Sequence, residues 1–86
     1  MYYVYVLQSF EDGGFYTGFT TDIDQRIKEH NSRQEPSTKS RAPFKLVYLE
    51  GCLSKKDAIT RERYLKSGKG KRYLNYRLSN YYKEIK

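Results

Sequence analysis

Hydrophobic and polar residues alternate on both sides of a short turn near the start of the chain. YYVYVLQS (2–9) and FYTGFT (15–20) are rich in aromatic and β-branched residues, and FEDGG lies between them. This pattern predicts a β-hairpin. Alternation places Val4 and Val6 on one face, toward a core, and Tyr5 on the other face. A register that pairs residue 5 with residue 16 or 17 would bring Tyr5 and Tyr16 together.

The rest of the chain changes to a helical spacing of apolar residues, interrupted by one more strand-like segment, FKLVYLEG. TTDIDQRIKEHN begins with Thr21 or Asp22 as a helix cap, whereas SKKDAITRERYLKSG begins at Ser54 and stops at Gly68. The pattern predicts one α+β domain, residues 1–86, on a small three-stranded sheet. The predicted order is strand, strand, helix, strand, helix, helix. The strands are expected at residues 2–9, 15–20 and 44–51, and the helices at 20–31, 54–68 and 70–86. Residues 81–86 are expected to form a fraying basic tail.

The positive charge is segregated along the chain. Residues 1–50 carry six Lys or Arg against seven Asp or Glu, whereas residues 51–86 carry eleven against three. Solubility explains a positive charge but not its segregation. The asymmetry therefore favours a polyanionic partner, of which nucleic acid is the commonest.

Composition excludes several classes of protein. The 86 residues allow a single modest hydrophobic core. The sequence contains no apolar run long enough to cross a membrane and no signal peptide, so we expect a soluble, cytoplasmic protein. One Cys and one His exclude an internal disulfide, a cysteine-rich zinc site and a two-histidine metal site. P-loop, G-x-S-x-G and H-E-x-x-H motifs are also missing from the sequence.

Five scattered polar residues together supply the parts that phosphodiester hydrolysis needs. Taken singly, each is explained more simply by packing or by a solvated surface. Hydrolysis needs a cation at the phosphate, a base for water and a proton for the leaving oxygen. A helix carboxylate can hold one Mg²⁺, an Arg can bind phosphate, and Tyr or His can accept or relay a proton. The candidates for these roles are Glu62, Arg26, Tyr5, Tyr16 and His30.

These residues resemble the motifs of the GIY-YIG nuclease superfamily, and more closely its small stand-alone bacterial UPF0213 (YhbQ-like) members. The resemblance rests on Tyr3-Val4-Tyr5, Tyr16-Thr17-Gly18, Arg26, His30 and the helix-borne Glu62, and extends over nearly the whole chain. Spacings of eleven, ten and four from Tyr5 to Tyr16, Arg26 and His30 make it specific. Tyr3 and Val4 stand where the family name has Gly and Ile, but the catalytic tyrosine is kept.

The resemblance implies a three-stranded antiparallel sheet flanked by helices, and single-metal endonuclease cleavage of DNA. We expect branched or damaged DNA as a substrate, in repair or recombination, and low sequence specificity because the chain carries no recognisable DNA-reading module. In that picture one of the two tyrosines, Tyr5 or Tyr16, helps to deprotonate water. Arg26 braces the phosphate, His30 assists proton movement, and Glu62 binds Mg²⁺ or Mn²⁺. Many relatives also use an asparagine from the last helix. Its counterpart here is Asn75, Asn80 or neither, and we carry Asn75 as the candidate.

Two other functions fit parts of the sequence. The basic, tyrosine-rich segment KGKRYLNYRLSNYYK (69–83) could follow a phosphate backbone and stack bases, as a non-catalytic nucleic-acid-binding module. Such a module would bind DNA or RNA in a salt-sensitive manner that is indifferent to EDTA. An adaptor for an acidic protein would require the five polar residues to be a coincidence. Sequence preference in a nuclease would come from DNA shape or from a protein partner.

Overall fold

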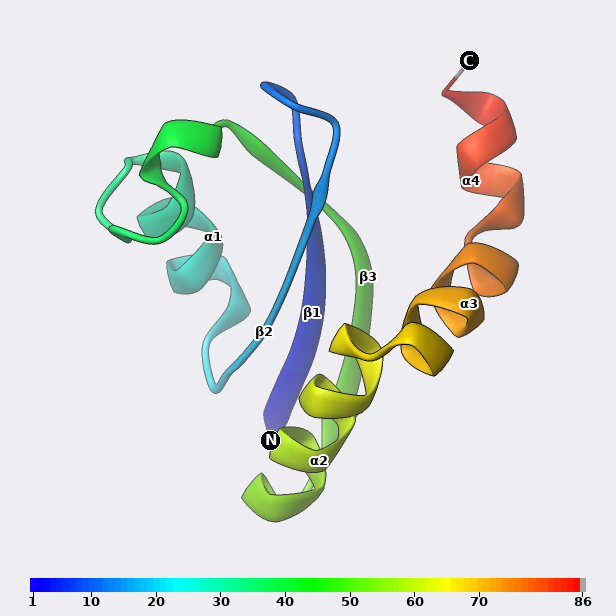
Figure 1. Ribbon diagram of the computed structural model, residues 1–86. Coiled ribbons are helices and arrows are strands. Elements are labelled where there is room, and N and C mark those ends of the chain that lie inside the picture. The colour runs from blue at the N-terminus through cyan, green and yellow to red at the C-terminus, as the bar shows by residue number, and fades with distance from the viewer. Residues whose placement is uncertain (86) are drawn as a thin grey trace.

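The computed structural model describes residues 1–85 and has eight elements (Figure 1). The predicted strands and the first two predicted helices are present. The last predicted helix is divided at Leu78, so three helices follow the third strand instead of two. The expected fraying tail is helical as far as Glu84, and Lys86 lies outside the described residues. The elements are β1 (Tyr2–Ser9), β2 (Phe15–Thr20), α1 (Ile23–Asn31), the short 3-10 helix η1 (Lys39–Arg41), β3 (Phe44–Cys52), α2 (Lys55–Lys66), α3 (Gly68–Arg77) and α4 (Ser79–Glu84).

The three strands form one antiparallel sheet in the order β2-β1-β3, as predicted for an α+β domain of this type. The register of the first hairpin differs from the predicted one. Tyr5 faces Gly18, and Leu7 faces Tyr16. The turn sets this register, because the backbone N–H of Ser9 donates to the carbonyl of Gly14 at 2.8 Å and closes the hairpin there.

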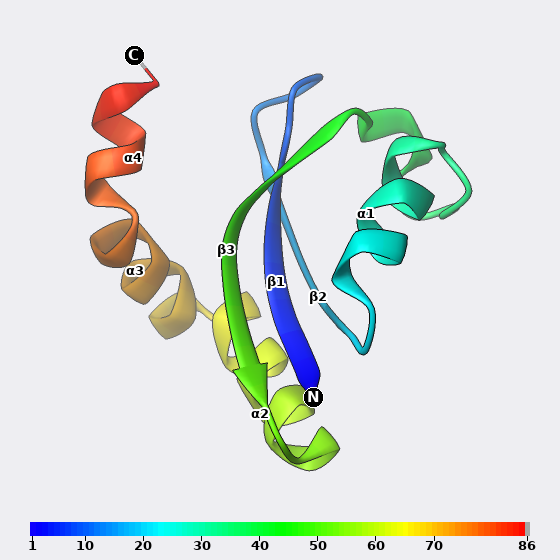
Figure 2. The same cartoon turned by 180° about the vertical axis from the view of Figure 1, so that it is seen from behind.

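Both faces of the sheet are buried, each by a different set of elements. Val4 and Val6 face α2, α3 and α4, and Leu65 and Leu74 of these helices complete that core. The opposite face carries Tyr5, which is 1% exposed and packs with residues of α1 and the 32–43 segment. The predicted core face of Val4 and Val6 is confirmed, and the face that carries Tyr5 is buried as well. Figures 1 and 2 show the sheet between α1 on one side and α2–α4 on the other.

Two local features fix α2 and α3 against the sheet. A Cβ at Gly70 would lie 1.9 Å from the carbonyl oxygen of Tyr64, so the close turn between the two helices requires glycine. The guanidinium of Arg61 lies over the rings of Tyr64 and Tyr73, at 5.0 and 4.8 Å, and binds the Glu50 carboxylate of β3. Among residues 1–85, no helix is long and apolar enough to cross a bilayer.

Candidate active site

The hydroxyl of Tyr5 is the point at which β1 and α1 meet. Arg26 and His30 lie one turn apart on α1 and both point to it. The Nε of Arg26 donates to the Tyr5 oxygen at 3.3 Å, and Nε2 of His30 lies 3.0 Å from the same oxygen. The structure therefore brings together three of the residues that the sequence analysis selected, from two elements that are far apart in the chain.

Gly18 makes room for this phenol. A Cβ at Gly18 would lie 2.6 Å from the Tyr5 hydroxyl and 2.8 Å from Cζ, distances that no real Cβ tolerates without movement of the ring. Tyr16 is diagonal to Tyr5 across the hairpin, so the two rings are still neighbours, with centroids 6.4 Å apart. The Tyr16 ring also lies 5.1 Å from His30. The predicted pairing of the phenols holds although the predicted register was wrong.

His30 is completely buried and links Tyr5 to Thr38. Its Nδ1 lies 2.8 Å from the Thr38 hydroxyl, on the side of the ring away from Tyr5. Burial, and next the nearby positive charge of Arg26, lower the pKa of His30, so the ring is neutral at physiological pH. The Tyr5 oxygen accepts from Arg26, and Nε2 of His30 is the acceptor within reach of the phenol proton, so we assign this proton to the bond with Nε2. The single ring N–H then lies on Nδ1 and donates to Thr38.

Two carboxylates hold the guanidinium of Arg26. Nη1 donates to Glu29 and Nη2 to Glu35, both at 2.9 Å, while Nε faces Tyr5. The guanidinium of Arg has five N–H donors, so one N–H on each Nη remains for a further ligand. A phosphate that approaches Arg26 meets two negative charges beside one positive charge. Arg26 is oriented in advance, but its charge is partly neutralised.

Burial raises the pKa of Tyr5 to about 12, although the hydrogen bond from Arg26 opposes this shift. The negative charge of Glu62 on α2 adds to this rise in pKa. At physiological pH Tyr5 is therefore protonated. It can pass a proton from water to His30, but it does not start as a phenolate.

Glu62 lies between the buried Ala58 and Leu65 on the side of α2 that faces the sheet. Its side chain is 18% exposed and pairs with Lys66 at 3.5 Å. Within residues 1–85 no group of three or more His, Cys, Asp or Glu could hold a metal ion. One partly buried carboxylate is nevertheless the donor set that Mg²⁺ accepts when water and substrate phosphate supply its other ligands. The residues present fit such an ion at Glu62.

A pocket of about 550 Å³ opens beside these residues, between β2 and the helices α2–α4. Tyr16 and Thr17 form its wall on the sheet side. Asn75 of α3 lines the same pocket, whereas Asn80 is not among its lining residues. Of the two asparagines considered from the sequence, Asn75 is the one that lines the same pocket as Tyr16.

Comparisons with known proteins agree with this arrangement. The sequence profile described as the GIY-YIG catalytic domain matches residues 1–83. The chain belongs to the GIY-YIG family. It is similar to a UPF0213 protein of Streptococcus pneumoniae, 43% identical over 68 residues, which are 78% of this chain and 68% of that protein. It is also similar to UPF0213 protein BH0048 of Halalkalibacterium halodurans, 46% identical over 59 residues, which are 67% of this chain and 62% of that protein.

A solved structure supports the same fold. The solution NMR structure of UPF0213 protein BH0048 from Bacillus halodurans aligns with a TM-score of 0.53 at 42% identity, over 86% of this chain and 82% of that one. The chain is thus a GIY-YIG domain of the UPF0213 group, as the resemblance in its motifs implied. GIY-YIG is a family of nucleases.

Three residues of this GIY-YIG site were not found from the sequence. Thr38 and Glu35 lie in the polar 32–43 segment, which has no apolar period, and Glu29 lies on α1 among other charged residues. The one available signal in the sequence was that Glu29 follows Arg26 by three residues, because side chains three residues apart on a helix can form an ion pair.

Proposed function

We propose that the protein is a metal-dependent endonuclease that hydrolyses phosphodiester bonds of DNA with low sequence specificity, in repair or recombination. The observation that carries the proposal is the convergence of Arg26 and His30 on the Tyr5 hydroxyl. A buried phenol with one donor and one acceptor at its oxygen forms a proton path. That path lies beside Tyr16. A phosphate, and a divalent ion held by Glu62, would be bound next to it.

In this mechanism the chain's own groups position the phosphate and move one proton. Glu62 would hold Mg²⁺ or Mn²⁺, which would neutralise phosphate charge and lower the pKa of bound water. Arg26 directs its remaining N–H groups to a phosphate oxygen. The Tyr5 oxygen takes a proton from the attacking water while its own proton passes to Nε2 of His30. The sugar oxygen of the P–O bond that breaks takes its proton from solvent water. Burial and the charge of Arg26 lower the pKa of His30, and the charges of Glu35 and Glu29 oppose this shift only in part, so the ring would hold the proton transiently.

The charge distribution supports a nucleic acid as the substrate. The helices α2–α4 and the residues next to them carry most of the positive charge, since residues 51–86 hold eleven Lys or Arg against three Asp or Glu. In Figure 1 these helices lie together along one side of the sheet. Such a surface attracts the phosphate backbone without reading bases.

A non-catalytic nucleic-acid-binding module is the second candidate function. It is favoured by the two carboxylates on Arg26, which neutralise the group that a nuclease would present to the phosphate. In that case the basic helices would bind the backbone, and the buried polar residues would only stabilise the fold.

Cleavage of labelled single-stranded, duplex, nicked and branched DNA, with Mg²⁺, Mn²⁺ or EDTA, separates the two functions. We expect metal-dependent cutting that Glu62→Gln and Tyr5→Phe each reduce by about 10²-fold or more, with DNA binding retained. Asp57→Asn, an exposed acid on the same helix, and Tyr76→Phe, an 85% exposed tyrosine, are the matched controls. Binding without cutting by the folded wild-type protein would support the binding module instead.

A further inference from the structure

The pocket between β2 and α2–α4 has the size of a small-molecule site. Its volume of about 550 Å³ lies within the range of about 300–1,000 Å³ that such sites have. It is open to solvent and is built from β2 and three successive helices. The proton path at Tyr5 does not use it, apart from Tyr16 at its edge.

The walls of the pocket suit a flat, uncharged ring. Leu65 and Leu74 are buried and line it from the helices. At one end Phe15 and Tyr82 meet edge to face, with ring centroids 5.7 Å apart, and Tyr16 lines the pocket from β2. Aromatic faces and aliphatic side chains of this kind stack on nucleobases without strong preference among them.

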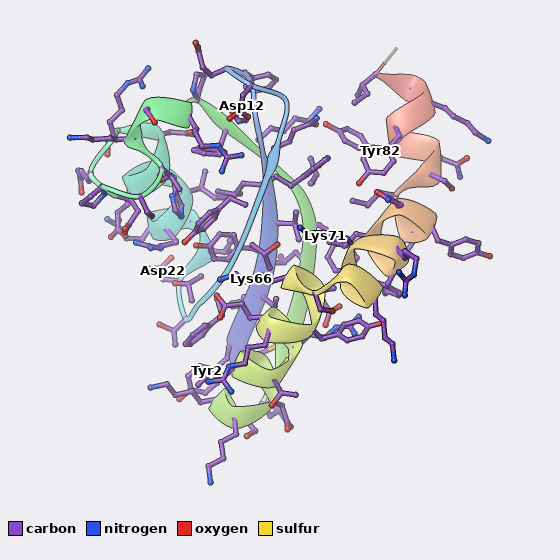
Figure 3. All side chains as sticks on the ribbon, viewed as in Figure 1. Tyr2, Asp12, Asp22, Lys66, Lys71 and Tyr82 are labelled. Atoms are coloured by element: carbon purple, nitrogen blue, oxygen red, sulfur yellow. The ribbon has the colours of Figure 1, made fainter. Side chains whose placement is uncertain are left out.

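The polar lining suits an anion attached to that ring. Lys66 and Lys71 line the pocket, and among its described lining residues none is Asp or Glu. Figure 3 shows these two lysines and Tyr82 on three successive helices, on the side that faces β2. Asn75 adds an amide with both donors and an acceptor. A flat ring next to a negative charge is the chemistry of a nucleotide.

From its lining and its position we infer that the pocket receives one unstacked nucleotide of the substrate strand, with its base between the aromatic walls and its phosphate at Lys66 and Lys71. Tyr16 lines the pocket, and its ring lies 5.1 Å from His30, so the pocket begins where the reacting phosphate would lie. A paired and stacked base cannot enter such a site. The inference rests on the proposed function, because it takes the ligand to be the DNA strand that the nuclease cuts. It assigns nucleic acids with displaced or unpaired nucleotides as the favoured substrate class.

Binding without metal tests this inference separately from catalysis. Fluorescence anisotropy in EDTA compares a perfect duplex, the same duplex with one bulged thymidine, and the same duplex with a bulged abasic residue. The abasic control keeps the bend and the phosphate but removes the base. We expect the bulged thymidine to bind about 10-fold more tightly than the abasic bulge, from the usual range of base–aromatic stacking. Equal affinities would overturn the inference.

Matched variants locate the effect in the pocket. Tyr82→Leu should remove most of the thymidine advantage while the abasic affinity stays, whereas Tyr76→Leu, on the exposed side of α3, should keep the advantage. A thymidine advantage that survives in a folded Tyr82→Leu protein would overturn the assignment to this pocket. If Tyr82→Leu does not fold, Tyr82→Trp gives a reporter, because the chain has no Trp. The bulged thymidine should quench its emission and the abasic bulge should not, and equal quenching would again contradict the inference.

Two further arms separate the alternatives. Free thymidine monophosphate that displaces the bulged duplex at micromolar concentration would assign the pocket to a free nucleotide and overturn its assignment to the substrate strand. Addition of Mg²⁺ or Mn²⁺ to the same bulged duplex then tests cutting. Tighter binding of the bulged thymidine without cutting would support the nucleotide pocket and contradict the nuclease. Cutting without tighter binding of the bulged thymidine would support the nuclease and contradict the pocket.

Discussion

Nδ1 of His30 lies within hydrogen-bond distance of the hydroxyl of Thr38, at 2.8 Å, and both side chains are fully buried. The Tyr5 side of the ring places the proton on Nδ1, and the Thr38 hydroxyl is the acceptor that satisfies it. With Nδ1 protonated, Nε2 is left as an acceptor toward Tyr5. Thr38 therefore positions the proton path although it does not touch the substrate.

Thr38→Val tests this positioning role. Loss of the hydroxyl leaves a buried ring N–H without its acceptor, and we expect a loss of about 1–3 kcal/mol in the free energy of unfolding. We also expect kcat to fall by about 10-fold with little change in KM, since the mechanism makes this contact part of proton transfer and not of binding. Thr38→Ser should restore both values. A variant that loses stability but keeps kcat would show that Thr38 is only structural.

His30 makes stability depend on pH in a predictable direction. Its pKa is lowered in the folded protein, chiefly by burial, so between that pKa and the unfolded value of about 6.5 the unfolded chain binds more protons. The free energy of unfolding should therefore be at its full value above about pH 6.5 and should decrease as the pH is lowered through this window. Urea unfolding from pH 8 to 5 measures the slope.

The single His of the chain makes this slope assignable. The folded protein's ring resonances should titrate with a midpoint below the ordinary histidine value, and His30→Gln should flatten the slope between pH 8 and 5. An equal slope in the variant would assign the pH dependence to other groups.

Gly18→Ala should disturb the site through Tyr5. The new Cβ would approach the phenol to 2.6 Å, and the ring is buried, so we expect overpacking to cost about 1–3 kcal/mol and to displace the hydroxyl from His30 and Arg26. Activity should fall together with stability. A double-mutant cycle with Tyr5→Leu checks the cause, because the Gly18→Ala cost should be much smaller when the phenol is absent. A cost that is the same in both backgrounds would contradict the steric explanation.

The local pattern of the sequence was enough for the elements but not for their register. Alternation of valine and tyrosine in residues 2–9 predicted β1, and Asp22 was one of two expected caps of α1. The pairing of Tyr5 with Gly18 instead of residue 16 or 17 follows from the bonds that close the turn, which composition does not determine. The division of the last helix at Leu78 likewise carries no Gly or Pro signal.

The candidate site was predictable where it lies on regular elements. Arg26 and His30 share one side of a helix by their spacing, and Tyr5 was assigned to one face of a strand. Thr38 and Glu35 reach the site only because the polar 32–43 segment folds back over α1. This packing is a tertiary contact that the local sequence pattern does not indicate. Similarly, the pocket next to Tyr16 requires three helices to pack beside β2.

Glu35→Gln should strengthen the binding of DNA. The carboxylate accepts a 2.9 Å bond from Nη2 of Arg26, in competition with any phosphate that approaches the same group. The amide keeps the shape but removes the charge, and we expect affinity to rise by about two- to fivefold, in the range of partly exposed charge pairs. Glu84→Gln makes the same change of charge on α4, away from Arg26, and serves as the control. Titrations at several salt concentrations should show a larger gain for Glu35→Gln than for Glu84→Gln. Equal gains would mean that net charge alone is responsible and that Glu35 does not restrain Arg26.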